Sequence, residues 1–161
     1  MNRPQITTDL SSALEKYLDP HNDPRIYWAK EVTFDYASLN AVRVDYIRFV
    51  PVNNTVSGIE KGDFYCYEIK SSVADFNSKN GHNFIGDFNY YVMPEDVAEA
   101  VKDRVPWGIG IMVPDKHGSL RVWKKARRLD RSRPVGEMLL MMWRSSRREI
   151  IHCRKEKSKL L

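Results

Sequence analysis

The sequence has few cysteines and no long apolar run, and both absences narrow the class of protein. The two cysteines among the 161 residues, Cys66 and Cys153, show no metal-ligand spacing, so we expect reduced thiols, without a disulfide framework or a zinc site. No apolar run approaches the roughly 20 residues that cross a bilayer, and the first residues lack a signal-peptide core. We therefore expect a cytoplasmic protein with no membrane partner.

Glycine and proline are also sparse, at eight residues each, and there is no internal repeat or low-complexity segment. With 42% hydrophobic, 29% charged and 11% aromatic residues, the composition is typical of a globular domain and excludes disordered and fibrous classes. No glycine-rich nucleotide fingerprint occurs, and the four histidines are scattered without metal-site spacing. Nothing therefore supports nucleotide-dependent chemistry or a histidine metal site.

Positive charge is concentrated at one end of the chain. Residues 121–161 contain 14 Lys and Arg against 4 Asp and Glu, a net charge of +10, and residues 1–120 carry the remaining −5. Clustered cations favour a polyanionic partner such as DNA, because binding releases counterions from phosphates. A solvated tail helix accounts for the charge alone equally well. We divide the chain into a domain at 1–125 and a basic helical extension at 126–161.

The spacing of apolar residues and helix breakers predicts a mixed order of helices and strands. Strands are predicted at 26–34, 41–50, 63–70, 88–93, 108–113 and 120–123. Helices are predicted from about Thr8 to 18, from Ser71 to about 79, from Pro94 to about 105, and from Pro134 to about 157. This order predicts an α/β fold with a central mixed sheet flanked by helices.

Two acidic residues are predicted to meet on neighbouring strands. The strands at 41–50 and 63–70 flank a connection centred between Val56 and Ser57, so a symmetric hairpin places Asp45 opposite Glu68. Alternation of side chains then predicts two faces. One face carries Arg43, Asp45, Ile47, Phe49, Phe64, Cys66, Glu68 and Lys70, and the other carries Val42, Val44, Tyr46, Tyr65, Tyr67 and Ile69.

Opposed carboxylates on adjacent strands repel each other, so a positive charge is expected beside them. Magnesium meets this need, because it binds one or two carboxylates and keeps other positions for water and phosphate. Lys70 lies two residues beyond Glu68 on the same face, where it can prepare a water molecule or stabilise charge on a phosphate. This pattern is typical of phosphodiester hydrolysis. A structural charge ladder, with Arg43 and Lys70 neutralising the two acids, accounts for the same spacing.

The residues around this pair carry a family resemblance. The run 67–76, Tyr-Glu-Ile-Lys-Ser-Ser-Val-Ala-Asp-Phe, follows Asp45 and precedes Phe-Asn-Tyr-Tyr-Val-Met-Pro at 88–94. Together these segments resemble the PD-(D/E)XK nuclease superfamily, and within it the MmcB-like group of proposed DNA-repair endonucleases and related phage and prophage proteins. The resemblance covers roughly residues 30–115. It implies a restriction-endonuclease-like αβββαβ core and endonuclease activity in DNA repair, recombination or phage DNA processing.

The resemblance assigns roles residue by residue. Asp45 and Glu68 match the two acids of the motif and Lys70 matches its lysine, with magnesium or manganese as the cofactor. It further implies that the main-chain carbonyl of Ile69 completes the metal shell. Glu31 stands where relatives often carry another acid, and is a candidate third ligand.

Three further positions bear on the same assignment. A turn centred on Ser38 would place Glu31 opposite Asp45, whereas a slip of one residue would turn it to the other face. Val44 stands in place of the proline in the superfamily's name, which leaves the carboxylates intact. Lys79 matches a lysine of MmcB-like sequences and is expected to contact phosphate, although a solvated lysine fits equally well.

The predicted final helix is amphipathic. Val135, Leu139, Met142, Ile150 and Cys153 lie near one face, which is suited to docking on the body or on a second subunit in a homodimer. The candidate contacts to DNA are Arg43, Lys79, Arg144, Arg147 and Arg148. Two alternatives stay open: a non-catalytic nucleic-acid-binding or phage assembly protein that keeps the nuclease fold, and a phage structural protein with a fortuitous charge ladder.

Overall fold

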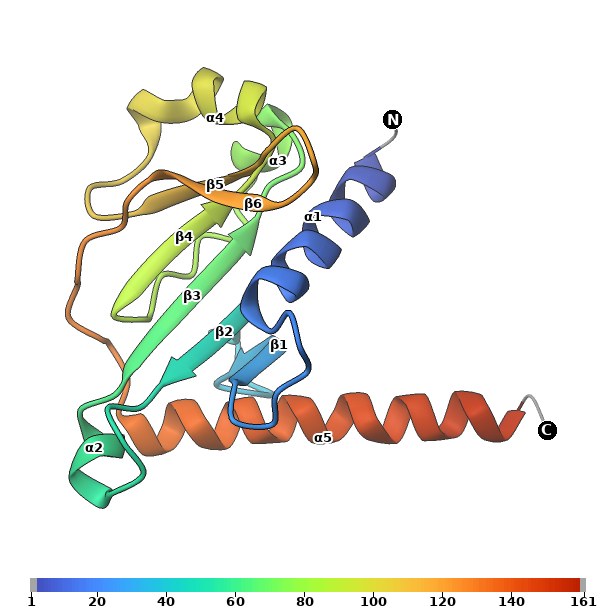
Figure 1. Cartoon of the computed structure of the whole chain (residues 1–161), viewed down its shortest axis with the longest axis vertical. Helices are drawn as coiled ribbons and strands as arrows, with labels where there is room; N and C mark the ends of the chain where they lie inside the picture. The colour runs from blue at the N-terminus through green and yellow to red at the C-terminus, as the bar shows by residue number, and fades with distance from the viewer. Residues whose placement is uncertain (1–2, 160–161) are drawn as a thin grey trace.

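In a computed structural model, which describes residues 3–159, six strands form one mixed sheet in sequence order from β1 to β6 (Figure 1). β1, β2 and β3 are antiparallel, β3, β4 and β5 run parallel, and β6 returns antiparallel to β5. The strands are β1 (Tyr27–Phe34), β2 (Val42–Val50), β3 (Asp63–Ile69), β4 (Phe88–Val92), β5 (Gly110–Pro114) and β6 (Leu120–Lys124).

Helices cover both faces of the sheet. Leu10, Leu14 and Leu18 of α1 pack on the face that carries Tyr46 and Tyr67, whereas α4 and the first half of α5 pack on the opposite face. The helices are α1 (Arg3–Leu18), α2 (Val56–Glu60), α3 (Val73–Phe76), α4 (Glu95–Val101) with the 3₁₀ turn η1 (Lys102–Arg104), and α5 (Val135–Lys159). The predicted α/β class, a mixed sheet flanked by helices, is confirmed.

Two helix boundaries and one additional helix differ from the prediction. α1 begins at Arg3 instead of about Thr8, and the Thr8 hydroxyl donates to the carbonyl of Pro4 from inside the helix. The connection between β2 and β3 contains the unpredicted helix α2, whose N-terminus is capped when Thr55 accepts from the N–H of Gly58. α3 ends at Phe76, three residues before the predicted end.

The predicted register of β2 against β3 is confirmed, from Val50 opposite Asp63 to Tyr46 opposite Tyr67. α2 therefore fits within the connection without shifting the pairing. The register of β1 against β2 also corresponds to a turn centred on Ser38, since Lys30 pairs with Tyr46 and Val32 with Val44.

Between those last two pairs, at Glu31 and Asp45, both strands lose their regular alternation. Ala29 and Val32 pack in the same cluster although they are three residues apart, and so do Val44 and Ile47. Regular strands would turn such residues to opposite faces. The prediction that Val44 shares a face with Tyr46 was therefore wrong, and so was that for Val42, which packs against the Val44 cluster.

Much of the basic segment before α5 is neutralised by the body. Arg131 pairs with the buried Asp87 at 2.8 Å, Arg128 with Asp63 at 2.6 Å, and Arg133 with Asp35 at 2.7 Å. Further on, α5 extends past the sheet, and residues 147–159 are all exposed (Figure 1). Among residues 3–159, no helix is long and apolar enough to cross a membrane.

Candidate active site

Asp45 and Glu68 come together at the end of β3. The Asp45 carboxylate accepts a hydrogen bond of 2.9 Å from the N–H of Ile69, which holds it against β3 next to Glu68. Glu68 is 0% exposed, and its Oε1 accepts from the N–H of Asn83 at 3.2 Å. Its Oε2 is buried with no hydrogen-bond partner in the part of the chain that the structure describes.

This environment favours the neutral form of Glu68. Burial, followed by the negative charge of Asp45, raises the pKa of Glu68 to about 9. The Asn83 N–H and the Lys70 ammonium group act in the opposite direction, and both are weaker than burial. Without a cation, Glu68 therefore carries a proton at neutral pH beside the Asp45 carboxylate.

Lys70 lies beside Glu68, as predicted, and is 2% exposed. Its Nζ donates to the carbonyl of Asn80 at 2.5 Å and to that of Asp75 at 3.3 Å. Asp75 also accepts from the N–H and the hydroxyl of Ser71, and this anchors α3 to the end of β3. The lysine is thus held by main-chain carbonyls of the segment that follows β3.

An open cleft of about 550 Å³ adjoins Asp45. Arg43 and Thr33 also line a second cleft of about 500 Å³, which reaches α5 at Arg148, so the two clefts are neighbours. The first cleft is lined by Thr33, Ala41, Val42, Arg43, Asp45, Lys79, Asn80, Gly81 and Asn83.

Glu31 does not join the two acids. It lies level with Asp45, as the register predicts, but its backbone has a φ of +55° and its exposed carboxylate binds Arg43 at 2.8 Å. Among residues 3–159 no group of three or more Asp, Glu, His or Cys side chains is arranged to hold a metal ion. The irregular backbone at this level turns Glu31 outward, which regular alternation did not predict.

The predicted cationic residues are only partly gathered. Lys79 and Arg43 line the cleft beside Asp45, and Arg148 lines the adjoining one while donating to the carbonyl of Glu31 at 2.8 Å. Arg144 stacks over Tyr36, with 4.3 Å from its guanidinium carbon to the ring centre. Arg147 is exposed, and helical spacing places it roughly 100° around α5 from Arg148.

Neither residue spacing nor the family resemblance identified the turn 80–83 as part of the site. The Asn-Gly pair there predicted only the end of a helix, yet Asn80, Gly81 and Asn83 contact Lys70 or Glu68. Their contribution depends on contacts with β2 and β3, so no local pattern could have revealed it.

The donor set fits a divalent cation of the magnesium type. Such ions prefer carboxylate and carbonyl oxygens and accept as few as two carboxylates. Asp45 and Glu68 supply the carboxylates, and the unpartnered Glu68 Oε2 is an oxygen that a cation would satisfy. The carbonyl of Ile69 is the further ligand that the family resemblance implies. Soft or borderline metals are disfavoured, because the one thiol nearby, Cys66, is buried and burial raises its pKa.

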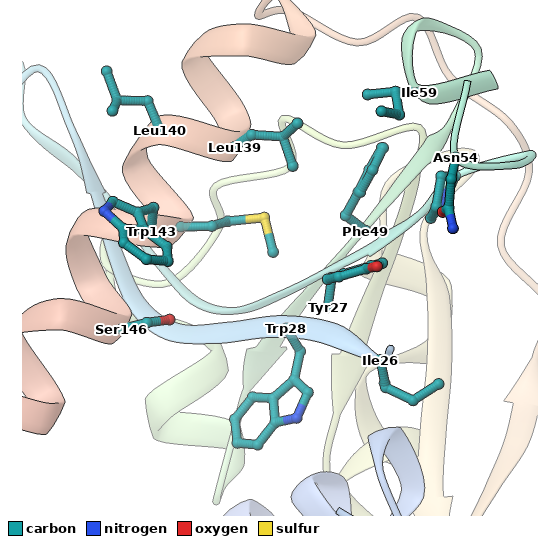
Figure 2. A pocket seen from close by; sticks show the side chains of 12 residues that line it. Ile26, Tyr27, Trp28, Phe49, Asn54, Ile59, Leu139, Leu140, Trp143 and Ser146 are labelled. Atoms are coloured by element: carbon teal, nitrogen blue, oxygen red, sulfur yellow. The ribbon is translucent and has the colours of Figure 1, made fainter. Parts of the chain in front are cut away.

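A larger cleft, of about 710 Å³, lies elsewhere, between β1 and the first half of α5 (Figure 2). Tyr27, Phe49, Leu139 and Trp143 are among its lining residues, and no Asp, Glu, His, Lys or Arg lines it in the described chain. Its lining therefore offers no carboxylate, imidazole or cationic group. The predicted apolar stripe of α5 divides here, with Val135 and Met142 buried on the sheet and Cys153 exposed.

Comparison with known proteins gives information on the fold alone. No family model and no curated protein matches the chain. A solved structure described as the SPO1766 protein of unknown function from Silicibacter pomeroyi is similar, with a TM-score of 0.62 and 14% identity. The match covers 94% of this chain and 92% of that one, so nearly the whole arrangement of helices and strands is shared.

Proposed function

We propose that this chain is a divalent-metal-dependent deoxyribonuclease of the PD-(D/E)XK type, acting as an endonuclease in DNA repair, recombination or phage DNA processing. The observation that carries the proposal is the approach of the Asp45 and Glu68 carboxyl groups on adjacent strands, with Lys70 beside them. The order α1, β1, β2, β3, α3, β4 supports a restriction-endonuclease-like core, with α2 as an insertion.

In this proposal Asp45, Glu68 and the carbonyl of Ile69 hold magnesium or manganese. When bound, the cation supplies Lewis acidity at the phosphate. Asp45 is already oriented by the N–H of Ile69, and Glu68 must release its proton to act as a ligand. The Lys70 ammonium group stabilises negative charge that develops on the phosphoryl oxygens. Lys79, Arg43 and Arg148 line the path along which the phosphate backbone would bind.

A non-catalytic nucleic-acid-binding protein with the same fold is the second candidate. The observation that favours it is the burial of Glu68 and Lys70, which leaves Asp45 as the acid that reaches the open cleft. A phage assembly protein would belong to the same non-catalytic class.

Cleavage of supercoiled plasmid, linear duplex and single-stranded DNA with magnesium or manganese tests the proposal. We expect cleavage that requires the cation, is lost in Glu68→Gln and Lys70→Met, and persists in the exposed control Glu60→Gln. Salt-sensitive DNA binding by the wild-type protein, without cleavage of any of these substrates, would refute the nuclease and support the binding protein.

A further inference from the structure

Residues 80–83, Asn-Gly-His-Asn, cover the two buried polar groups of the site, and we call them the cover loop. Gly81 lies directly against both groups. A Cβ atom at Gly81 would lie 2.8 Å from Lys70 Nζ and 3.3 Å from Glu68 Oε2. The backbone of the loop thus occupies the side from which a phosphate or a cation would reach these atoms.

Three hydrogen bonds hold the cover loop over the site. The carbonyl of Asn80 accepts from Lys70 Nζ at 2.5 Å, and the N–H of Asn83 donates to Glu68 Oε1 at 3.2 Å. The Asn83 side chain reaches across to β2, where its Nδ2 donates to the carbonyl of Arg43 at 2.7 Å. The loop therefore bridges β3 and β2 over the carboxylates.

A second set of contacts, made by the ring of His82, holds the middle of the cover loop. The His82 ring binds the hydroxyl of Tyr91 at 2.6 Å and the carbonyl of Ser78 at 2.8 Å, and it packs edge-on against Phe76. These contacts lie on α3, β4 and the turn before the loop, away from β2. His82 is thus a fixed point in the loop, and opening would require Asn80, Gly81 and Asn83 to move about it.

The bonds made by the loop are ones that a substrate can replace. A phosphoryl oxygen can accept from Lys70 in place of the Asn80 carbonyl, and its negative charge adds an attraction to the ammonium group that the neutral carbonyl lacks. The bond from Asn83 to Arg43 is solvent-exposed, so water can replace it when the loop moves.

We propose that the cover loop is a closed gate over Glu68 and Lys70, that Asn83 latches it to β2, and that phosphodiester binding opens it. The part about substrate rests on the proposed nuclease function. The closed gate itself rests on the burial of Lys70 and Glu68 and on the three hydrogen bonds of the cover loop. Asn83 is a positioning residue, because it acts through the loop and through Glu68.

Lysine acetylation, followed by digestion and mass spectrometry, measures this gate without any cleavage assay. With a water-soluble N-hydroxysuccinimide ester of acetate, we expect Lys70 of the wild-type protein to react far more slowly than the exposed Lys79. Asn83→Ala should raise the Lys70 rate by about threefold to tenfold, the effect of one lost hydrogen bond, and leave Lys79 unchanged. Asn40→Ala, in the exposed turn between β1 and β2, is the matched control and should change neither rate.

Equal rates for Lys70 and Lys79 in the wild-type protein would overturn the gate, as would a folded Asn83→Ala protein with an unchanged Lys70 rate. If Asn83→Ala does not fold, Gly81→Ala decides, because its Cβ would lie 2.8 Å from Lys70 Nζ and alanine is strained at the positive φ of Gly81, so Lys70 and the loop must separate and acetylation should speed up. Faster acetylation in these variants with no DNA cleavage by any form would refute the nuclease and leave the gate. Cleavage by the wild-type protein, with unaltered acetylation of Lys70 in the variants, would refute the gate and leave the nuclease.

Discussion

The Asp45 carboxylate accepts a hydrogen bond of 2.9 Å from the main-chain N–H of Ile69, so a side chain of β2 satisfies a main-chain donor at the end of β3. The regular pairing between these strands ends at Tyr46 and Tyr67, one residue pair before Asp45. The acid proposed to hold a cation therefore also stabilises the sheet.

Substitutions at Asp45 should separate these two roles. Asp45→Ala leaves the Ile69 donor without its acceptor and should lower the free energy of unfolding by about 1–3 kcal/mol. Asp45→Asn keeps an oxygen acceptor and removes a charge beside Glu68, so its stability should lie within about 0.5 kcal/mol of wild type. Both variants should lose cleavage. Urea unfolding in EDTA provides the test, and equal stability of the two variants would contradict the structural role.

Glu68 should make stability depend on pH. Burial and Asp45 raise its pKa from 4.5 to about 9, so in that window the folded chain keeps a proton that the unfolded chain releases. The contribution of Glu68 is fully present below about pH 4.5 and is lost as the pH rises towards 9, by up to about 1.4 kcal/mol per pH unit.

Glu68→Gln stays neutral and should remove this dependence. In EDTA, the stability of the variant relative to wild type should be greater at pH 8.5 than at pH 5.5, as measured by urea unfolding. Glu60→Gln, at an exposed position, is the control, and its free energy of unfolding should change with pH as that of wild type does. If the free energy of unfolding of Glu68→Gln also changed with pH as that of wild type does, Glu68 would ionise normally in the folded protein.

Arg131 should contribute strongly to stability although it lies in a charged segment. It pairs with Asp87, which is buried and also accepts from the N–H of Phe64 at 2.8 Å. Arg131→Ala leaves a buried carboxylate without its main partner and should cost about 3 kcal/mol. Arg25→Ala breaks an exposed pair with Asp23 and should cost much less, because solvent screens that pair. Similar losses for both variants in urea unfolding would refute this distinction.

Lys79 and Arg148 should contact DNA phosphates if the two neighbouring clefts form the binding path. Each contact contributes about 0.9 to the slope of log affinity against log salt concentration, so the double variant Lys79→Ala and Arg148→Ala should lower that slope by about 1.8. Lys116→Ala, in the exposed turn before β6, should leave the slope unchanged. An identical slope for the double variant and wild type would place DNA elsewhere.

Local patterns predicted the pairing on which the site depends. The symmetric connection and the alternation of side chains set the register of β2 and β3, and an inserted helix did not alter it. The position of Glu31 opposite Asp45 in the strand register was predicted as well, but the direction of its side chain was not. A backbone with positive φ at a glutamate is uncommon and leaves no mark in the residue pattern.

The basic segment illustrates the same limit. Its composition predicted a polyanionic partner, yet Arg128, Arg131 and Arg133 pair with acids from three distant parts of the chain. Charge counting cannot distinguish such pairs from free cations, because the distances between them arise only on folding.

By itself the sequence determined which residues pair along β2 and β3, that Asp45 and Glu68 meet with Lys70 nearby, and that helices cover a mixed sheet. These outcomes follow from period and turn length, which act over a few residues. Tertiary structure decided that Glu31 faces Arg43, that the cover loop buries Lys70, and that Glu68 holds a proton. Those outcomes depend on burial and on contacts between segments far apart in the chain, which exist only once the whole sheet and its helices have packed.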